Sequence, residues 1–142
     1  MSTVRTGSAR YEGLGKEGRG SVSTQSGALD NQFYGFKTRF ENEKGTNPEE
    51  LIAAAHASCF TMALAFALSR AGFSEGTLET SAAVTLDKDD TGFVITRSDL
   101  HLNAEVPGIT PEQFDELAAG AKATCPVSRL LNAEVSLTHH LA

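Results

Sequence analysis

The chain has 142 residues, 40% of them hydrophobic and 21% charged, a composition that is typical of a folded protein with one core and excludes a disordered chain. The net charge is −6 and the 12 basic residues are scattered, so nucleic-acid binding is not expected, because phosphate contacts require clustered Lys and Arg. The first residues hold no secretory signal and no apolar run of about 18 residues lacks polar breaks, which predicts a cytoplasmic protein without membrane attachment.

The first forty or so residues are expected to form two or three antiparallel strands. The segments SARYEG, GSVSTQSG and QFYGFKTRF are short, rich in aromatic or β-branched residues and separated by glycines. The run from Gly13 to Gly18 matches the G-x-G-x-x-G pattern of dinucleotide-binding loops, but strand and turn formers follow it where such a site needs a helix. We therefore interpret this run as a glycine-rich hairpin loop.

Residues 47–72, NPEELIAAAHASCFTMALAFALSRAG, predict the longest helix. Asn47 is a good N-cap, Glu50 stands where a capping box places its acid, and Gly72 provides the end. From residue 51 to 68 the helix is apolar almost all round, so it should be central and covered on most sides. Because a chain this small supplies little cover of its own, we expect a homodimer.

The second half of the chain predicts a hairpin, two helices and a closing strand. Asp87 begins a match to a calcium-binding loop, but Ser98 stands where the bidentate Glu belongs, so DKDDTG is interpreted as a turn. Thr110 is the expected N-cap of the longer helix. The expected elements are, in order, TLETSAAVTLD, GFVITRSDLHLNAEV, TPEQFDELAAGAKAT, PVSRLLNA and EVSLTHHLA. Residues 1–142 are therefore predicted to form a single α+β domain.

One face of the long helix carries Glu49, His56 and Cys59. His56 and Cys59 are three residues apart and therefore neighbours on the helix surface. Glu49 precedes His56 by seven residues, which places it within about 20° of the same face at roughly 100° per residue. Two interpretations are open: a capping glutamate, a hydrogen-bonded core histidine and an inert cysteine, or a stripe that serves a reactive thiol.

Cys125 and Arg39 leave similar alternatives. Cys125 directly precedes a proline at a predicted helix start, where unpaired N–H groups would stabilise a thiolate, or where the cysteine is only a weak cap. Arg39 is either a surface charge or, near a thiol, a cation that lowers the thiol pKa and orients an oxygen-bearing substrate. No metal site is expected, because His139 and His140 are adjacent on a strand and point to opposite faces.

The segment YGFKTRFENEKGTNPEELIAAAHASCFTMAL, followed by KATCPVS, resembles the OsmC-type peroxiredoxins of the OsmC/Ohr family, and the similarity covers nearly the whole chain. The resemblance implies an α+β fold in which antiparallel sheets wrap around long central helices in an intertwined homodimer. It also implies that Cys59 is the peroxidatic cysteine, that Cys125 is the resolving cysteine, and that Arg39 and Glu49 activate the thiol.

The activity implied by the resemblance is the reduction of organic hydroperoxides to alcohols, with hydrogen peroxide as a poorer substrate. A Cys59 thiolate would become a sulfenic acid, which condenses with Cys125 to a disulfide. No bound cofactor is implied, and an external dithiol of the lipoyl type would restore both thiols by exchange. Because burial in an apolar helix disfavours a thiolate, Cys59 needs a cationic neighbour, and Arg39 held by Glu49 is the best candidate.

Helix geometry adds one constraint. Ten residues of helix place Glu49 about 15 Å along the axis from Cys59, too far for a carboxylate to act beside its own thiol. Either the helix is interrupted, or Glu49 serves the thiol of a partner's antiparallel helix, which is the alternative we favour. His56 is expected to be structural, since the thiolate needs no base once Arg39 is present.

Two other classes of function are weighed against the enzyme. In a redox sensor the cysteine pair would switch the shape of the protein and turnover would be incidental. In a structural dimer the cysteines would be inert and an apolar ligand would bind between the helices. Recycling by a dithiol favours the enzyme, a single slow oxidation favours the sensor, and unreactive thiols favour the structural dimer.

Overall fold

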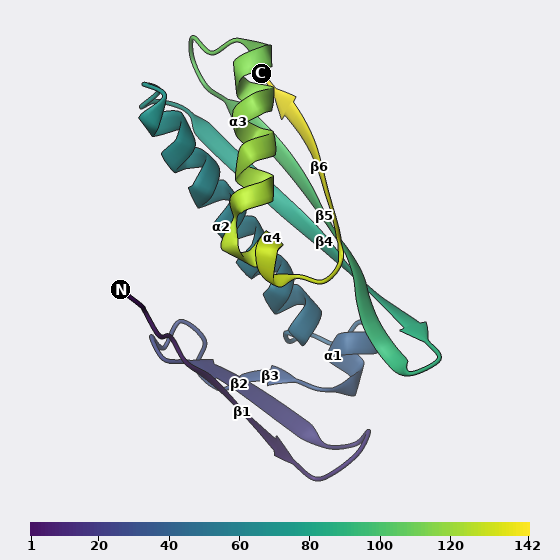
Figure 1. Ribbon diagram of the computed structural model, residues 1–142. Helices are drawn as coiled ribbons and strands as arrows, with labels where there is room; N and C mark the ends of the chain where they lie inside the picture. Colours follow the sequence, from purple (N-terminus) through teal and green to yellow (C-terminus); the bar gives the residue numbers. More distant parts are fainter. The chain divides into compact units, whose positions relative to one another are not determined.

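The computed structural model describes residues 1–142, and the chain forms two compact units, Met1–Leu51 and Ile52–Ala142 (Figure 1). Both units contain helix and strand, which confirms the predicted α+β class. The organisation as one domain over residues 1–142 stays a prediction.

The first unit contains a three-stranded antiparallel sheet with the order β1-β2-β3. Its strands are β1 (Gly7–Glu12), β2 (Arg19–Thr24) and β3 (Gln32–Tyr34). The predicted glycine-rich hairpin loop joins β1 to β2, and Gly13 and Gly15 adopt positive φ there. A Cβ at Gly18 would lie 2.2 Å from the Tyr11 ring, so this glycine lets the ring fold over the loop.

The helix α1 (Phe36–Phe40) corrects the prediction that QFYGFKTRF is a strand, because only its first three residues pair with β2. The Thr38 hydroxyl accepts a hydrogen bond from the Gly35 N–H at 2.8 Å and donates one to the Gly35 carbonyl at 3.0 Å, which closes the first turn. Phe36 and Phe40 then stack at i and i+4 with 5.0 Å between ring centroids. Arg39 consequently lies on a helix and not on a strand.

The helix α2 (Pro48–Arg70) begins and ends as predicted. The Asn47 side chain accepts a hydrogen bond from the Glu50 N–H at 2.8 Å, whereas the Glu50 carboxylate binds the Thr46 hydroxyl instead of closing a capping box. At the other end Gly72 has a φ of +99°, and the Phe73 N–H reaches the Leu68 carbonyl at 2.9 Å. These are the features of a Schellman motif, in which glycine supplies the left-handed residue.

The second unit contains a sheet with the order β4-β5-β6. The strands β4 (Thr77–Asp89) and β5 (Gly92–Glu105) form the predicted antiparallel hairpin, and Asp89 accepts hydrogen bonds from the turn residues after it. The closing strand β6 (Glu134–Leu141) pairs parallel to β5, which corrects the expectation of purely antiparallel sheets. Two helices connect β5 to β6, and a connection of that length allows the parallel pairing that a tight hairpin does not.

Those connecting helices are α3 (Pro111–Thr124) and α4 (Pro126–Leu130). Thr110 caps α3 as predicted, accepting a hydrogen bond from the Gln113 N–H at 3.1 Å, whereas α4 is shorter than the predicted PVSRLLNA. Side chains of α2, α3 and β5 share one core, so both long helices of Figure 1 cover the same face of this sheet. The core residues are Phe60, Leu64, Leu68, Leu100, Leu102, Ala104, Val106, Phe114, Ala118, Ala121 and Cys125.

Only one side of α2 is buried within the chain, in line with the expectation that a chain this small supplies little cover of its own. The buried side chains, His56, Phe60, Leu64 and Leu68, recur every four residues and form a single stripe. On other sides Met62 and Phe66 are 61% and 58% exposed. With a mean hydropathy of 1.9, α2 is long and apolar enough to cross a membrane by these two criteria, which core helices of soluble proteins also satisfy.

Candidate thiol site and its ion pair

Two free cysteines meet in the second unit. Cys59 lies in the middle of α2 and is partly buried, whereas Cys125 is completely buried between α3 and α4. Pro126 ends α3, and the Cys125 N–H still bonds the Ala121 carbonyl at 2.9 Å while its own carbonyl accepts from Arg129 at 3.1 Å. Cys59 packs against the core cluster that contains Cys125, and the two thiols influence each other's pKa, so the fold brings together the two cysteines that the sequence singled out.

The surroundings of Cys125 favour its thiolate. Burial by itself would raise the pKa of Cys125, but the polar groups of Ser128, Cys59 and Val127 near its sulfur together lower the pKa below its ordinary value. The helix start that was predicted after Cys125 is present, but the Cys125 side chain makes no capping hydrogen bond there.

The same contacts act on Cys59 in the opposite direction. Burial raises the pKa of Cys59, and donating a hydrogen bond to Cys125 raises it further, whereas the Val127 N–H lowers it. Within one chain the pKa of Cys59 is therefore raised and that of Cys125 is lowered.

His56 is completely buried, and its ring is hydrogen-bonded to two serines, Ser98 and Ser128, that the sequence pattern did not single out. Its Nδ1 lies 2.6 Å from the Ser98 hydroxyl of β5, and its Nε2 lies 2.8 Å from the Ser128 hydroxyl of α4. Burial lowers the pKa of His56, so the ring is neutral near pH 7. The sequence offered two signals for these serines: Ser98 is a polar residue among the inward positions of a strand, and Ser128 follows Cys125 by three residues.

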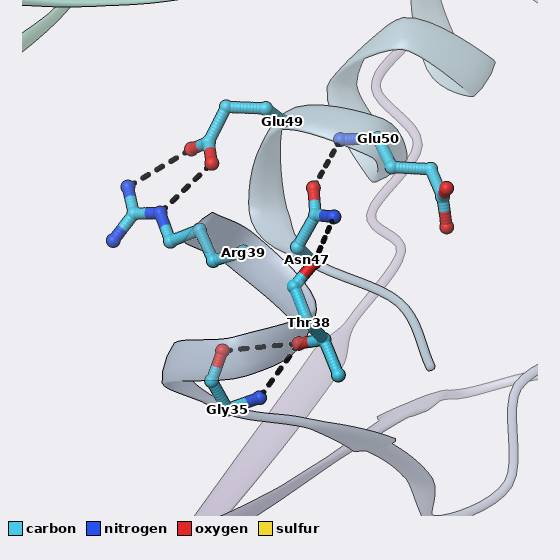
Figure 2. Close-up of polar contacts among 6 residues, drawn as sticks. All are labelled: Gly35, Thr38, Arg39, Asn47, Glu49 and Glu50. Carbon is cyan, nitrogen blue, oxygen red and sulfur yellow. Dashed lines mark hydrogen bonds and ion pairs between the residues drawn. The ribbon is translucent and has the colours of Figure 1, made fainter. Parts of the chain in front are cut away.

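A separate pair of charged residues lies in the first unit, where Figure 2 shows Arg39 and Glu49 pointing toward each other. Arg39 Nε and Nη2 donate to the two Glu49 carboxylate oxygens at 2.8 and 2.9 Å. This bidentate contact raises the pKa of Arg39, and the two side chains are only 33% and 12% exposed. Asn47 ties their helices together by donating from its amide to the Thr38 carbonyl at 2.9 Å.

A cavity of about 270 Å³ opens beside Arg39 within the first unit. Aromatic rings form much of its lining, and the Arg39 guanidinium lies 5.3 Å from the centroid of the Phe40 ring. The lining residues are Tyr11, Gly15, Lys16, Tyr34, Gly35, Phe36, Arg39, Phe40 and Pro48. An aromatic pocket with two basic residues, Lys16 and Arg39, in its lining suits a small apolar ligand that carries a polar end.

The four predicted site residues thus fall into two clusters, one per unit. Cys59 and Cys125 form the first, and Arg39 and Glu49 form the second. The helix α2 is uninterrupted from Pro48 to Arg70, which removes the alternative of a broken helix between Glu49 and Cys59. No group of three or more His, Cys, Asp or Glu side chains converges in a way that could hold a metal ion.

Comparison with known proteins shows which family and which relatives this chain resembles. The model of the family described as OsmC-like protein matches residues 41–140, a range that includes Glu49, Cys59 and Cys125. The chain is 53% identical over 141 residues to peroxiredoxin OsmC of Escherichia coli strain K12, with 99% of each chain covered. It is 30% identical over 130 residues to the organic hydroperoxide resistance protein OhrA of Bacillus subtilis, covering 90% of this chain and 89% of that protein.

Solved structures agree with these relatives. An organic hydroperoxide resistance protein from Elizabethkingia anophelis superposes with a TM-score of 0.76 at 29% identity, with 100% of both chains covered. OhrB of Bacillus subtilis gives a TM-score of 0.69 at 26% identity, covering 99% of this chain and 98% of that one. The chain belongs to the OsmC family. The prediction of a peroxiredoxin-type enzyme with an OsmC/Ohr-like α+β fold is confirmed at this level of class.

Proposed function

We propose that the chain is a thiol peroxidase that reduces organic hydroperoxides to alcohols, using Cys59 as the peroxidatic cysteine and Cys125 as the resolving one. The observation that carries this proposal is the placement of two free cysteines, one buried and one partly accessible, in the same core. Relatives named for organic hydroperoxide resistance support the choice of substrate class.

Each step of the proposed reaction balances. The Cys59 thiolate attacks the distal peroxide oxygen, the O–O bond breaks, and the alkoxide leaves as the alcohol after taking one proton. Cys59 is then a sulfenic acid, and the Cys125 thiolate attacks its sulfur, so that a disulfide forms and water leaves. A dithiol reduces this disulfide by two exchanges and is itself oxidised. Because Cys59 packs against the core cluster that contains Cys125, we expect the second step to need little movement.

The protonation of the resting pair makes a cation necessary. With burial and Cys125 both raising the pKa of Cys59, the nucleophile is mostly protonated near pH 7 unless a positive charge approaches it. Arg39 fits this role, because Glu49 fixes its guanidinium in one orientation and leaves Nη1 outside the bidentate contact. In the proposed site Nη1 faces the thiolate and the peroxide oxygens.

We assign Arg39 and Glu49 to the thiol of a partner subunit in a homodimer. An unbroken α2 puts Glu49 about 15 Å along the axis from Cys59 of the same chain. The uncovered side of α2 offers the surface for a second copy, because the exposed Met62 and Phe66 line a shallow apolar groove of about 660 Å³. Burying this groove would also cover the rest of the apolar helix.

The substrate preference follows from the lining of the site. Aromatic rings around Arg39 would bind the organic part of a hydroperoxide and offer nothing comparable to hydrogen peroxide. We expect a dithiol of the lipoyl type as reductant, no bound cofactor, and a cytoplasmic location, where thiols are kept reduced.

The test is steady-state consumption of cumene hydroperoxide and of hydrogen peroxide, with dihydrolipoamide as reductant. The wild type should consume the organic peroxide with the higher kcat/KM, and Cys59→Ser should consume neither. Equal kcat/KM for the two peroxides would refute the substrate preference. An inactive wild type with intact, reduced thiols would refute the peroxidase itself.

A further inference from the structure

The glycine-rich loop between β1 and β2 places Lys16 at the aromatic pocket of the first unit. Gly15 has a φ of +80°, and its carbonyl accepts hydrogen bonds from the Tyr11 hydroxyl at 2.9 Å and from the Gly18 N–H at 3.2 Å. These contacts hold the backbone immediately before Lys16. The Lys16 Nζ lies over the ring of Phe36, 4.7 Å from its centroid.

The pocket therefore has two cations, each over a different aromatic ring. The Arg39 guanidinium lies 5.3 Å from the centroid of the Phe40 ring. The rings of Phe36 and Phe40 are themselves neighbours, with 5.0 Å between their centroids, and all of these side chains line one cavity of about 270 Å³. A small ligand that lies along the two rings can reach the cation at each of them.

The two cations differ in what they already bind. Both oxygens of the Glu49 carboxylate accept hydrogen bonds from Arg39. The Lys16 ammonium forms no ion pair and no hydrogen bond within the chain, so its contact with the Phe36 ring leaves all three of its donor protons available. An ionised carboxylate only accepts hydrogen bonds and pairs well with such an ammonium.

We propose that Lys16 is a specificity-determining residue that binds an anionic group on the organic part of the substrate, so that the preferred hydroperoxides also carry a carboxylate. This inference rests on the proposed function, which puts the peroxide oxygens at Arg39 and the organic part along the aromatic rings. Lys16 takes no part in bond breaking. Because the chain has a net charge of −6, an anionic substrate would be disfavoured here without a specific cation to bind it.

A matched pair of substrates tests this role: cumene hydroperoxide, and the same molecule with a carboxylate on the ring, para to the carbon that bears the peroxide. The measured quantity is the ratio of kcat/KM for the carboxylated peroxide to kcat/KM for its parent. In the wild type this ratio should exceed one. It should fall about fivefold in Lys16→Gln, the worth of one partly exposed ion pair. Lys16→Arg keeps the positive charge and should restore most of the ratio.

The fall should appear in KM and not in kcat, because the carboxylate contact is the same before and during cleavage of the O–O bond. Lys37→Gln is the matched control: Lys37 is exposed on α1 of the same unit but does not line the pocket, so the ratio should stay unchanged. Lys16 is exposed in its loop, so its variants should fold, which circular dichroism checks. A wild-type ratio below one, equal ratios in wild type and Lys16→Gln, or an equal fall in Lys37→Gln would each overturn the inference.

A binding measurement separates this inference from the proposed function. The alcohol products of the two peroxides are titrated into wild type and Lys16→Gln, and the amide signals of residues 13–18 are followed by NMR. The wild type should bind the carboxylated alcohol more tightly than its parent, and Lys16→Gln should lose this preference. If an inactive wild type shows that result, the peroxidase is refuted and the anion site stands. If an active wild type binds both alcohols equally, the anion site is refuted and the peroxidase stands.

Discussion

The thiol cluster of the second unit and the ion pair of the first unit achieve fixed geometry by different means. In the thiol cluster the polar groups are uncharged: His56 and Ser98 are buried, Ser128 is half-buried, and the hydrogen bonds of His56 reach Ser98 on β5 and Ser128 on α4. Arg39 and Glu49 are instead charged, partly exposed, and held by a bidentate contact between α1 and the first turn of α2.

The difference shows where this fold accommodates neutral polar groups and where it accommodates charged ones. His and Ser side chains that stay neutral can be buried, because burying a neutral hydrogen-bonded group costs much less free energy than burying an ion. A guanidinium is better placed at an accessible position, where desolvation costs little and where it can approach a second chain. Variants in each region therefore test this comparison.

The largest effect is expected at the thiol cluster. Cys59→Ser should reduce peroxide turnover to the background rate, whereas Cys125→Ser should still consume about one equivalent of peroxide before Cys59 is over-oxidised, because no thiol resolves the sulfenic acid. Mass spectrometry of the oxidised proteins separates the two variants. A sulfinic acid on Cys59 in Cys125→Ser is expected, and steady turnover by Cys59→Ser would contradict the assignment of the nucleophile.

The next effect concerns the uncovered side of α2. Phe66→Glu would bury a charge if two copies meet there, and self-association should weaken by roughly a hundredfold or more, together with activity. Light scattering over a range of concentrations measures the mass. The matched control is Ala119→Glu, which adds the same charge to an exposed position of α3 and should leave the mass unchanged. A dimeric Phe66→Glu would place the interface elsewhere.

At the ion pair, Arg39→Lys keeps the positive charge and loses the bidentate geometry. We expect kcat/KM for cumene hydroperoxide to fall about tenfold to a hundredfold, the worth of one charge-assisted hydrogen bond. Arg10→Lys is the control in the same unit, because Arg10 pairs with Glu12 at the surface, where such pairs contribute little. Equal activity of Arg39→Lys and wild type would show that charge alone suffices.

The smallest effect is a pH dependence of stability caused by His56. Burial lowers its pKa below the unfolded value near 6.5, so the unfolded state binds more protons below that pH. The free energy of unfolding should therefore be unaffected by His56 above about pH 6.5 and should fall below it by up to about 1.4 kcal/mol per pH unit.

Urea denaturation of wild type and His56→Gln between about pH 5 and 8 checks this prediction. The substituted glutamine does not titrate, so carboxylates affect both proteins alike and the difference between them isolates His56. Wild type should lose stability relative to His56→Gln as the pH falls. Parallel curves would contradict a buried neutral ring.

Most elements were predictable because their signals are local. The cap at Asn47 and the glycine at Gly72 each satisfy backbone groups within a few residues, so the sequence placed both ends of α2. The helix α1 was missed because the aromatic residues around Gly35 favour a strand. In the structure, the hydrogen bond of the Thr38 hydroxyl and the contact between the Phe36 and Phe40 rings stabilise a helical turn instead. The parallel pairing of β6 depends on the crossover before it and has no local signal.

The site was predictable in its residues but not in its electrostatics. Spacing and resemblance singled out Cys59, Cys125, Arg39 and Glu49, and the fold brings each pair together. The lowered pKa of Cys125 depends on polar groups that the start of α4 brings near its sulfur. The partners of His56 have weak signals in the sequence: Ser98 is a polar residue at an inward strand position, and Ser128 follows Cys125 by three residues.

Subunit complementation tests most directly whether the two clusters act together across two chains. Heterodimers of Cys59→Ser with Glu49→Ala keep one complete site if the thiol and the ion pair come from different chains, so about half the activity of a wild-type dimer should return. Heterodimers of wild type with the double variant Cys59→Ser/Glu49→Ala should stay inactive, because each site then carries one lesion. The reverse result, activity only in the second heterodimer, would show that each chain completes its own site.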